Sequence, residues 1–109
     1  MLFITQGRFT QDAIKGMLAK PEDRAESVAQ LFSKSGGKLL GYYMTFGEYD
    51  FLVISEGPFE GAAAAAIIVA ASGGITDLKT VPALTSGEMK QAFERAGPIA
   101  ASFKGAGKH

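Results

Sequence analysis

The chain has 109 residues, 47% of them apolar, and its 11 Lys and Arg side chains balance 11 Asp and Glu side chains. This length suits one domain with a single core. The charge balance argues against nucleic-acid and anionic-membrane partners, because both require an excess of positive charge. The sequence contains no cysteine, which excludes disulfides and thiolate chemistry and is compatible with the cytoplasm, the location we expect.

Neither the first residues of the chain nor its alanine-rich run has the features of a signal peptide or of a membrane span. Residues 1–9 lack the basic opening and the long apolar run of a signal peptide. The apolar run from Ala62 to Ala71 has about half of the roughly 20 residues that cross a bilayer. We therefore expect a soluble protein that is not exported.

The first third of the chain predicts a strand followed by a helical segment. Residues 2–8 are rich in β-compatible residues, and Thr10 offers a helix N-cap. Apolar residues then recur at helical spacing up to Phe32. Pro21 predicts a break or kink in this segment, and Gly36 with Gly37 predicts its end.

Residues 38–56 predict a β-hairpin, because two β-rich runs flank the turn FGEY. A two-residue loop at 47–48 and a four-residue loop at 46–49 give the same register, with Tyr43 opposite Leu52 and Thr45 opposite Asp50. Alternation assigns the side chains to two faces. One face carries Gly41, Tyr43, Thr45, Asp50, Leu52 and Ile54, and the other carries Leu40, Tyr42, Met44, Phe51 and Val53.

The second half of the chain predicts a helix, a strand and a final helix. Pro58 precedes an alanine-rich helix that is smooth enough for close packing, and residues 75–82 form the fourth strand. Thr85 and Glu88 have the spacing of a capping box. We expect the last helix to end at Gly97 and Pro98, so that residues 1–97 form the domain and residues 98–109 a flexible tail.

This order predicts an α+β, ferredoxin-like βαββαβ fold with a four-stranded antiparallel sheet and an additional C-terminal helix. In that fold the helices cover one face of the sheet. Both faces of the hairpin carry large apolar side chains, so the open face needs a cover from outside the chain. We expect a homodimer that packs sheet to sheet, or a higher homo-oligomer.

The segment GKLLGYYMTFGEYDFLVISEGP, preceded by TQGRFT in the first strand, resembles the GYD domain family of dimeric α/β-barrel proteins. The likeness is most specific at Gly47, Tyr49 and Asp50. It implies the fold and self-association, but no settled activity. The hairpin is also similar to the ligand-sensing domain of leucine-responsive regulators, where a glycine and an acid border an amino-acid site between subunits. Those regulators carry a DNA-binding domain before the sensing domain, whereas the first strand starts at the N-terminus of this sequence, so we expect no DNA binding.

Asp50 is the first candidate for a functional residue, and two interpretations stand. In the structural interpretation its carboxylate accepts backbone N–H bonds at the hairpin end or pairs with a cation, while Gly47 supplies the turn. In the functional interpretation Asp50, Tyr43 and Thr45 line a cavity that orients a small ligand. Arg8 or Thr5 from the first strand would join them, but they point to opposite faces.

We expect neither a cofactor nor a metal. The only histidine is His109, the last residue, and the acids near Pro21 are typical of a helix start. Two functions remain: a homo-oligomeric module that binds a small metabolite in a barrel cavity or at a subunit contact, or a cofactor-free enzyme. The second rests on the related dimeric α/β-barrel proteins, which include monooxygenases and isomerases. A purely structural role in assembly is a third alternative.

Overall fold

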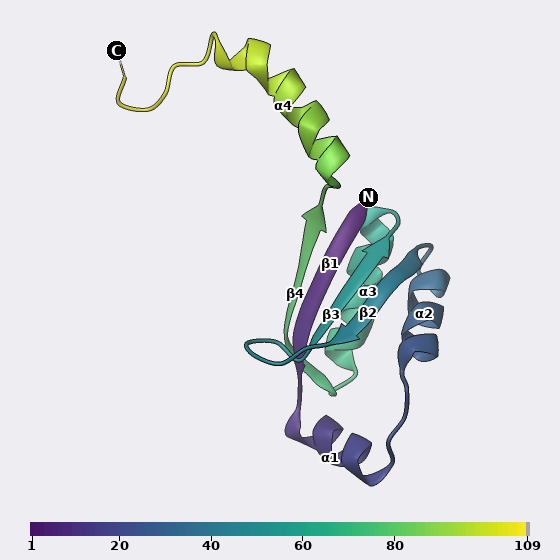
Figure 1. Ribbon diagram of the computed structural model, residues 1–109. Helices are drawn as coiled ribbons and strands as arrows, with labels where there is room; N and C mark the ends of the chain where they lie inside the picture. The colour runs from purple at the N-terminus through teal and green to yellow at the C-terminus, as the bar shows by residue number, and fades with distance from the viewer. Residues whose placement is uncertain (109) are drawn as a thin grey trace.

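The structure of the protein is a computed structural model that describes residues 1–108, so His109 lies outside the described residues. It contains four strands and four helices (Figure 1). In chain order they are β1 (Leu2–Phe9), α1 (Gln11–Ala19), α2 (Ala25–Lys34), β2 (Lys38–Met44), β3 (Phe51–Glu56), α3 (Phe59–Ala71), β4 (Ile75–Ala83) and α4 (Ser86–Ala100).

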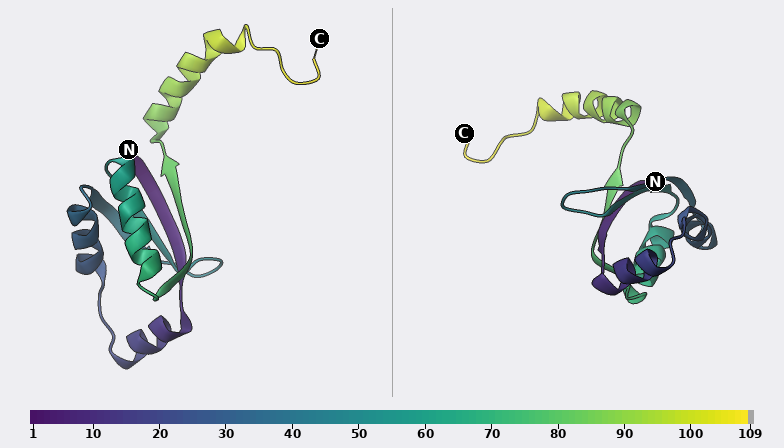
Figure 2. Two further views of the ribbon diagram at one scale, coloured as in Figure 1. Left: turned by 180° about the vertical axis from the view of Figure 1, so that it is seen from behind. Right: turned by 60° about the horizontal axis from the view of Figure 1, so that its bottom comes forward.

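The four strands form one antiparallel sheet in the order β2-β3-β1-β4. Helices α2 and α3 lie side by side on one face of this sheet, and α1 lies beyond the end where β1 finishes (Figures 1 and 2). The other face of the sheet carries no helix of the described chain. This is the predicted ferredoxin-like α+β fold with one additional helix at its C-terminal end.

Most of the residues that were predicted to begin and end helices do so in the structure. The Thr10 hydroxyl accepts a hydrogen bond from the Ala13 N–H at the start of α1. The chain leaves helical conformation between α1 and α2, around Pro21, and Gly36 has the left-handed φ of 86° that ends α2. The capping box of Thr85 and Glu88 begins α4.

The hairpin has the predicted register, with Tyr43 opposite Leu52, and the Thr45 N–H donates to the Asp50 carbonyl (2.9 Å). The four residues 46–49 therefore form the loop. The assignment of Leu40 to the face of Tyr42 was wrong. Gly41 pairs with Ile54 and Leu39 with Ser55, so Leu40 is the extra residue of a β-bulge. Leu39, rather than Leu40, packs against the core.

The predicted end of the last helix at Gly97 and Pro98 was also wrong, because α4 continues to Ala100. A proline inside a helix removes one hydrogen bond, here to the Glu94 carbonyl, and crowds the preceding turn. The helical conformation nevertheless continues through Ile99 and Ala100.

The core lies between the sheet and the two helices that cover it. Its buried residues are Phe32 of α2, Phe51 and Val53 of β3, and Ala65 of α3. Gly61 lets α3 approach the end of α2 so closely that a Cβ atom there would collide with the Ser35 carbonyl oxygen. The two helices are therefore in contact at this end.

Candidate functional site

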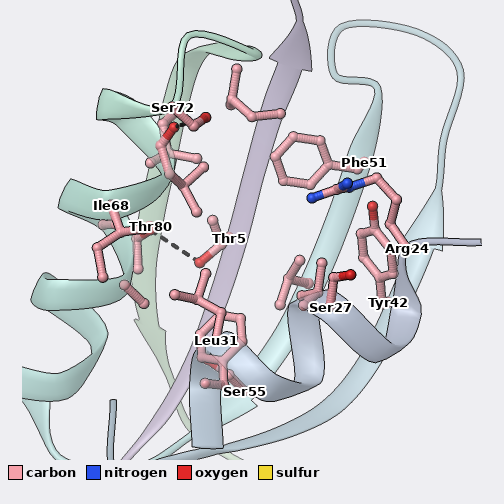
Figure 3. A pocket seen from close by; sticks show the side chains of 18 of the residues that line it. Thr5, Arg24, Ser27, Leu31, Tyr42, Phe51, Ser55, Ile68, Ser72 and Thr80 are labelled. Carbon is pink, nitrogen blue, oxygen red and sulfur yellow. Dashed lines mark hydrogen bonds between the residues drawn. The ribbon is translucent and has the colours of Figure 1, made fainter. Parts of the chain in front are cut away.

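A cavity of about 290 Å³ lies between the sheet and helices α2 and α3 (Figure 3). Strand β3 supplies Phe51, Val53 and Ser55 to its floor, because alternate residues of a strand face the same side. Most of the lining is apolar. The helices contribute Val28, Leu31, Phe32, Ala62, Ala65, Ala66, Ile68 and Val69.

The composition of α3 explains why this space is not filled. Three of its residues at the cavity, Ala62, Ala65 and Ala66, end at Cβ and leave room that larger side chains would occupy. The helices touch where Gly61 meets Ser35, so the space widens toward the other end of the pair. The cavity is therefore a consequence of small residues along a helix that is fixed at one end.

The cavity has a buried end and an end that reaches the surface. Ser55, at one end, is only 2% exposed. Arg24 and Ser72 lie at the other end (Figure 3), and the side chain of Arg24 is 46% exposed. A ligand would therefore enter beside the start of α2 and the end of α3.

Two threonine hydroxyls form a polar site in the otherwise apolar wall of the cavity. Thr5 of β1 and Thr80 of β4 are opposite each other in the sheet register, and their Oγ1 atoms lie 3.0 Å apart (Figure 3). One hydroxyl donates to the other, which leaves one proton and further lone pairs for a ligand. This pair is able to donate one hydrogen bond and to accept others.

A second polar group lies at the open end. The Tyr42 side chain and the Arg24 guanidinium approach each other there, and the guanidinium extends toward Phe51 (Figure 3). Burial raises the pKa of the Tyr42 phenol, and the positive charge of Arg24 opposes that shift only in part. The phenol is therefore a neutral hydrogen-bond donor at neutral pH. Arg24 also pairs with the Glu22 carboxylate (Nη1 to Oε1, 2.8 Å).

Asp50 lies outside the cavity lining and makes the contacts of the structural interpretation. Its Oδ2 atom accepts a hydrogen bond from the Phe9 N–H (2.9 Å), and its own N–H donates to the Gly7 carbonyl (2.8 Å). Gly47 has a φ of 130°, as a glycine turn requires. The acid thus joins the hairpin loop to the end of β1.

Thr45 and Arg8 also belong to this loop cluster. Thr45 Oγ1 donates to the Tyr49 carbonyl, and Arg8 Nε donates to the Glu48 carbonyl. The Arg8 guanidinium lies 5.8 Å from the centre of the Tyr49 ring and 3.7 Å from the Asp77 carboxylate. The structure thus brings four of the five predicted residues to the hairpin end.

Tyr43, the fifth predicted residue, lies apart from that cluster. It pairs with Leu52 and is 59% exposed on the open face of the sheet. Its neighbour Tyr42, on the other face of the hairpin, packs against the core and also lines the cavity. Thr5 also lines it, whereas Arg8 belongs to the hairpin cluster, so of these two only Thr5 faces the cavity.

Sequence reasoning did not identify Arg24, Ser27 or Thr80 as lining residues. Their positions depend on how α2 and β4 pack on the sheet, which no local pattern reveals. The alanine-rich run was predicted to pack closely. It does so at Gly61, whereas Ala62, Ala65 and Ala66 of the same helix line the cavity.

Two further properties concern residues 1–108 alone. No three His, Asp or Glu side chains in this range are grouped so that they could hold a metal ion. No helix in this range has the length and apolar character needed to cross a membrane.

Comparison with known proteins gives one finding on the family. The model of the GYD domain matches residues 3–93, from β1 into α4. A search of curated proteins finds none that matches the chain.

Proposed function

The chain belongs to the GYD domain family, and from this membership and the cavity we propose that it is a cytoplasmic, homo-oligomeric module that binds a small, mostly apolar metabolite between its sheet and its helices. The family itself carries no known function. The observation that carries the proposal is the cavity beneath α2 and α3, with apolar walls and polar groups at defined points.

The size and chemistry of the cavity support this function. Ligand pockets are apolar clefts with a few polar groups that orient the ligand, and their volumes begin at about 300 Å³. The cavity here, of about 290 Å³, lies at the lower end of that range. It therefore suits a compact metabolite better than a nucleotide or a flavin.

The polar groups define the expected ligand further. The Thr5–Thr80 pair offers a hydrogen bond at the β1–β4 wall, and Tyr42 offers a neutral donor near the open end. Arg24 adds positive charge at the surface, partly balanced by Glu22. We expect a ligand with an aromatic or aliphatic body and one hydroxyl, carbonyl or carboxylate group.

Self-association is the second part of the proposal. Ile4, Leu52 and Ile54 are neighbours on the sheet face that carries no helix of the described chain. Their side chains are partly exposed, and apolar surface left uncovered typically marks an interaction site. A second copy of the chain supplies a matching apolar surface, so a homo-oligomer is the expected assembly.

A pair of substitutions in α3 tests ligand binding. Ala66→Met fills the cavity, whereas Ala63→Met places the same side chain at an exposed position of the same helix. A panel of small aromatic and aliphatic alcohols and carboxylic acids is screened by thermal shift and by ligand-observed NMR. We expect compounds that bind the wild-type chain and Ala63→Met but not Ala66→Met, with both variants folded.

Two outcomes would count against the proposal. Binding of the same compounds by Ala66→Met would place the ligand outside the cavity, and a panel without any binder to the wild-type chain would remove the support for binding. Mass spectrometry of the same samples also detects chemical conversion of a bound compound, which would favour the enzyme alternative.

A further inference from the structure

Helix α4 projects from the body of the molecule. It continues beyond the end of β4 and away from the sheet and its two covering helices (Figures 1 and 2). The radius of gyration is 18.2 Å, whereas a compact chain of about 100 residues has about 13 Å. The long axis of the molecule measures 63 Å, more than twice the 30 Å of the next.

This helix is amphipathic, although it has no core of its own to face. Met89, Phe93 and Ile99 are exposed and lie on one side, with Ala92 and Ala96 between them, and Phe93 is 72% exposed. Lys90 and Glu94 form an ion pair of 3.0 Å on the other side. An apolar stripe of this width is typical of a helix that packs on an apolar surface.

The open face of the sheet is a surface of that kind. One row across the strands is Gly41–Ile54–Ile4–Val81, and the next is Tyr43–Leu52–Gln6–Lys79. Ile4, Ile54 and Leu52 form its centre. The described chain thus has an apolar sheet face without a helix and an apolar helix without a sheet.

We propose that α4 of one copy packs across the open sheet face of a second copy, and that the two copies exchange these helices reciprocally. The dimensions match: the 15 residues of α4 span about 22 Å, and the six residues of β3 span about 20 Å. Helices then cover both faces of each sheet, which is a stable layer arrangement.

The connection between β4 and α4 favours exchange over a return to the same sheet. Only Leu84 and Thr85 separate the two elements, and Thr85 is extended (φ −69°, ψ 162°). Thr85 is already held in the capping box with Glu88, so Leu84 alone lies between the end of β4 and the capped start of α4. For α4 to fold back onto its own sheet, the chain would have to reverse its direction at that one residue. Reciprocal exchange of an element between two copies requires no such reversal.

The area involved is sufficient for a stable dimer. The stripe, with Leu84 at its start, exposes four large apolar side chains per copy, and a single aromatic side chain such as Phe93 accounts for roughly 150–250 Å² when it is buried. Counted over both surfaces of both contacts, the exchange approaches the roughly 1,600 Å² of a standard stable interface. Direct sheet-to-sheet packing would leave the stripe of α4 in water.

The absence of cysteine from the sequence makes a clean cross-linking experiment possible. Gln6→Cys places one thiol on the open face, opposite Leu52, and Ala96→Cys places one on the apolar stripe of α4. Gln91→Cys, on the polar side of α4, is the matched control. The full-length variants are mixed in pairs, allowed to exchange, and treated with a short bismaleimide after thiol titration.

The proposal predicts a mixed product between Gln6→Cys and Ala96→Cys, and at least tenfold less between Gln6→Cys and Gln91→Cys. Efficient linkage of Gln6→Cys to itself would instead show sheet-to-sheet packing and overturn the proposal. So would linkage of Ala96→Cys to Ala63→Cys on the outer side of α3, or a monomer in sedimentation equilibrium at tens of micromolar. The cross-linking result does not depend on the cavity. The experiment therefore tests the exchange of α4 separately from ligand binding.

Discussion

The Asp50 carboxylate accepts a hydrogen bond from the backbone N–H of Phe9 (Oδ2 to N, 2.9 Å). This contact connects the loop between β2 and β3 to the last residue of β1. A second bond, from the Asp50 N–H to the Gly7 carbonyl (2.8 Å), strengthens the same connection. The acid at the hairpin end therefore holds two segments together that lie about forty residues apart in the sequence.

Asp50→Ala should lower the free energy of unfolding by about 1–2 kcal/mol, because it leaves the partly buried Phe9 N–H without its partner. Asp50→Asn retains an acceptor oxygen and should cost less than half as much. Denaturant unfolding measures both losses. Compounds that enter the cavity should bind Asp50→Asn with unchanged affinity. Loss of that binding at unchanged stability would instead establish Asp50 as a ligand residue.

Gly61→Ala should destabilise the chain by about 1–3 kcal/mol, because the new Cβ atom would collide with the Ser35 carbonyl oxygen and push α3 from α2. Gly16→Ala in α1 is the matched control, since a Cβ atom there meets no atom within 4 Å. It should stabilise the chain by about 0.5–1 kcal/mol. Chemical denaturation of both variants checks the pair, and equal effects would contradict the close contact of the helices.

Tyr42 should make stability fall at high pH. Burial raises its pKa in the folded state above the unfolded value of about 10. The folded state therefore favours the protonated phenol. This contribution is fully present below about pH 10 and is lost as the pH rises through the folded pKa. Unfolding curves between pH 8 and 11.5 should show a weaker decline for Tyr42→Phe than for the wild-type chain.

Tyr43→Phe is the control for that experiment, because Tyr43 is exposed on the open face. Each variant lacks one phenol, so a difference between their pH profiles reports the different surroundings of Tyr42 and Tyr43. A profile of Tyr42→Phe that coincides with that of Tyr43→Phe would contradict the burial of the Tyr42 hydroxyl at the cavity.

The helix content should depend on protein concentration if α4 packs on a second copy. An isolated helix of about 15 residues is only marginally stable in water. Dilution below the dissociation constant of the dimer should therefore reduce the circular dichroism signal at 222 nm. Phe93→Lys should produce the same loss at high concentration, whereas Gln91→Lys should not. A signal independent of concentration in a chain that sediments as a dimer would show that α4 is stable without the contact.

Much of the fold was readable from local patterns. The signals that begin and end helices depend on contacts with residues only a few positions away, as at Thr10, Gly36 and the Thr85–Glu88 capping box. Their effects therefore follow directly from the sequence. The register of the hairpin followed from its short loop. The bulge at Leu40 did not, because it depends on which side chain of β2 fits against the helices.

The candidate site was harder to predict, since it depends on contacts between distant segments. Gly7 is an example: a Cβ atom there would lie 2.8 Å from the ring of Phe51, and no local signal links these two residues. The cavity likewise combines Thr5 with Thr80 and Arg24 with Tyr42. The sequence identified the hairpin end as a candidate ligand site. In the structure, Asp50 and Arg8 instead connect the hairpin loop to β1.

Native mass spectrometry of the full-length protein, isolated from its own host, is the decisive test of ligand binding in the cavity. We expect an oligomer that carries one discrete small molecule per subunit, and loss of that added mass in Ala66→Met but not in Ala63→Met. The bare subunit mass for the wild-type chain, or an added mass that Ala66→Met retains, would contradict ligand binding in the cavity.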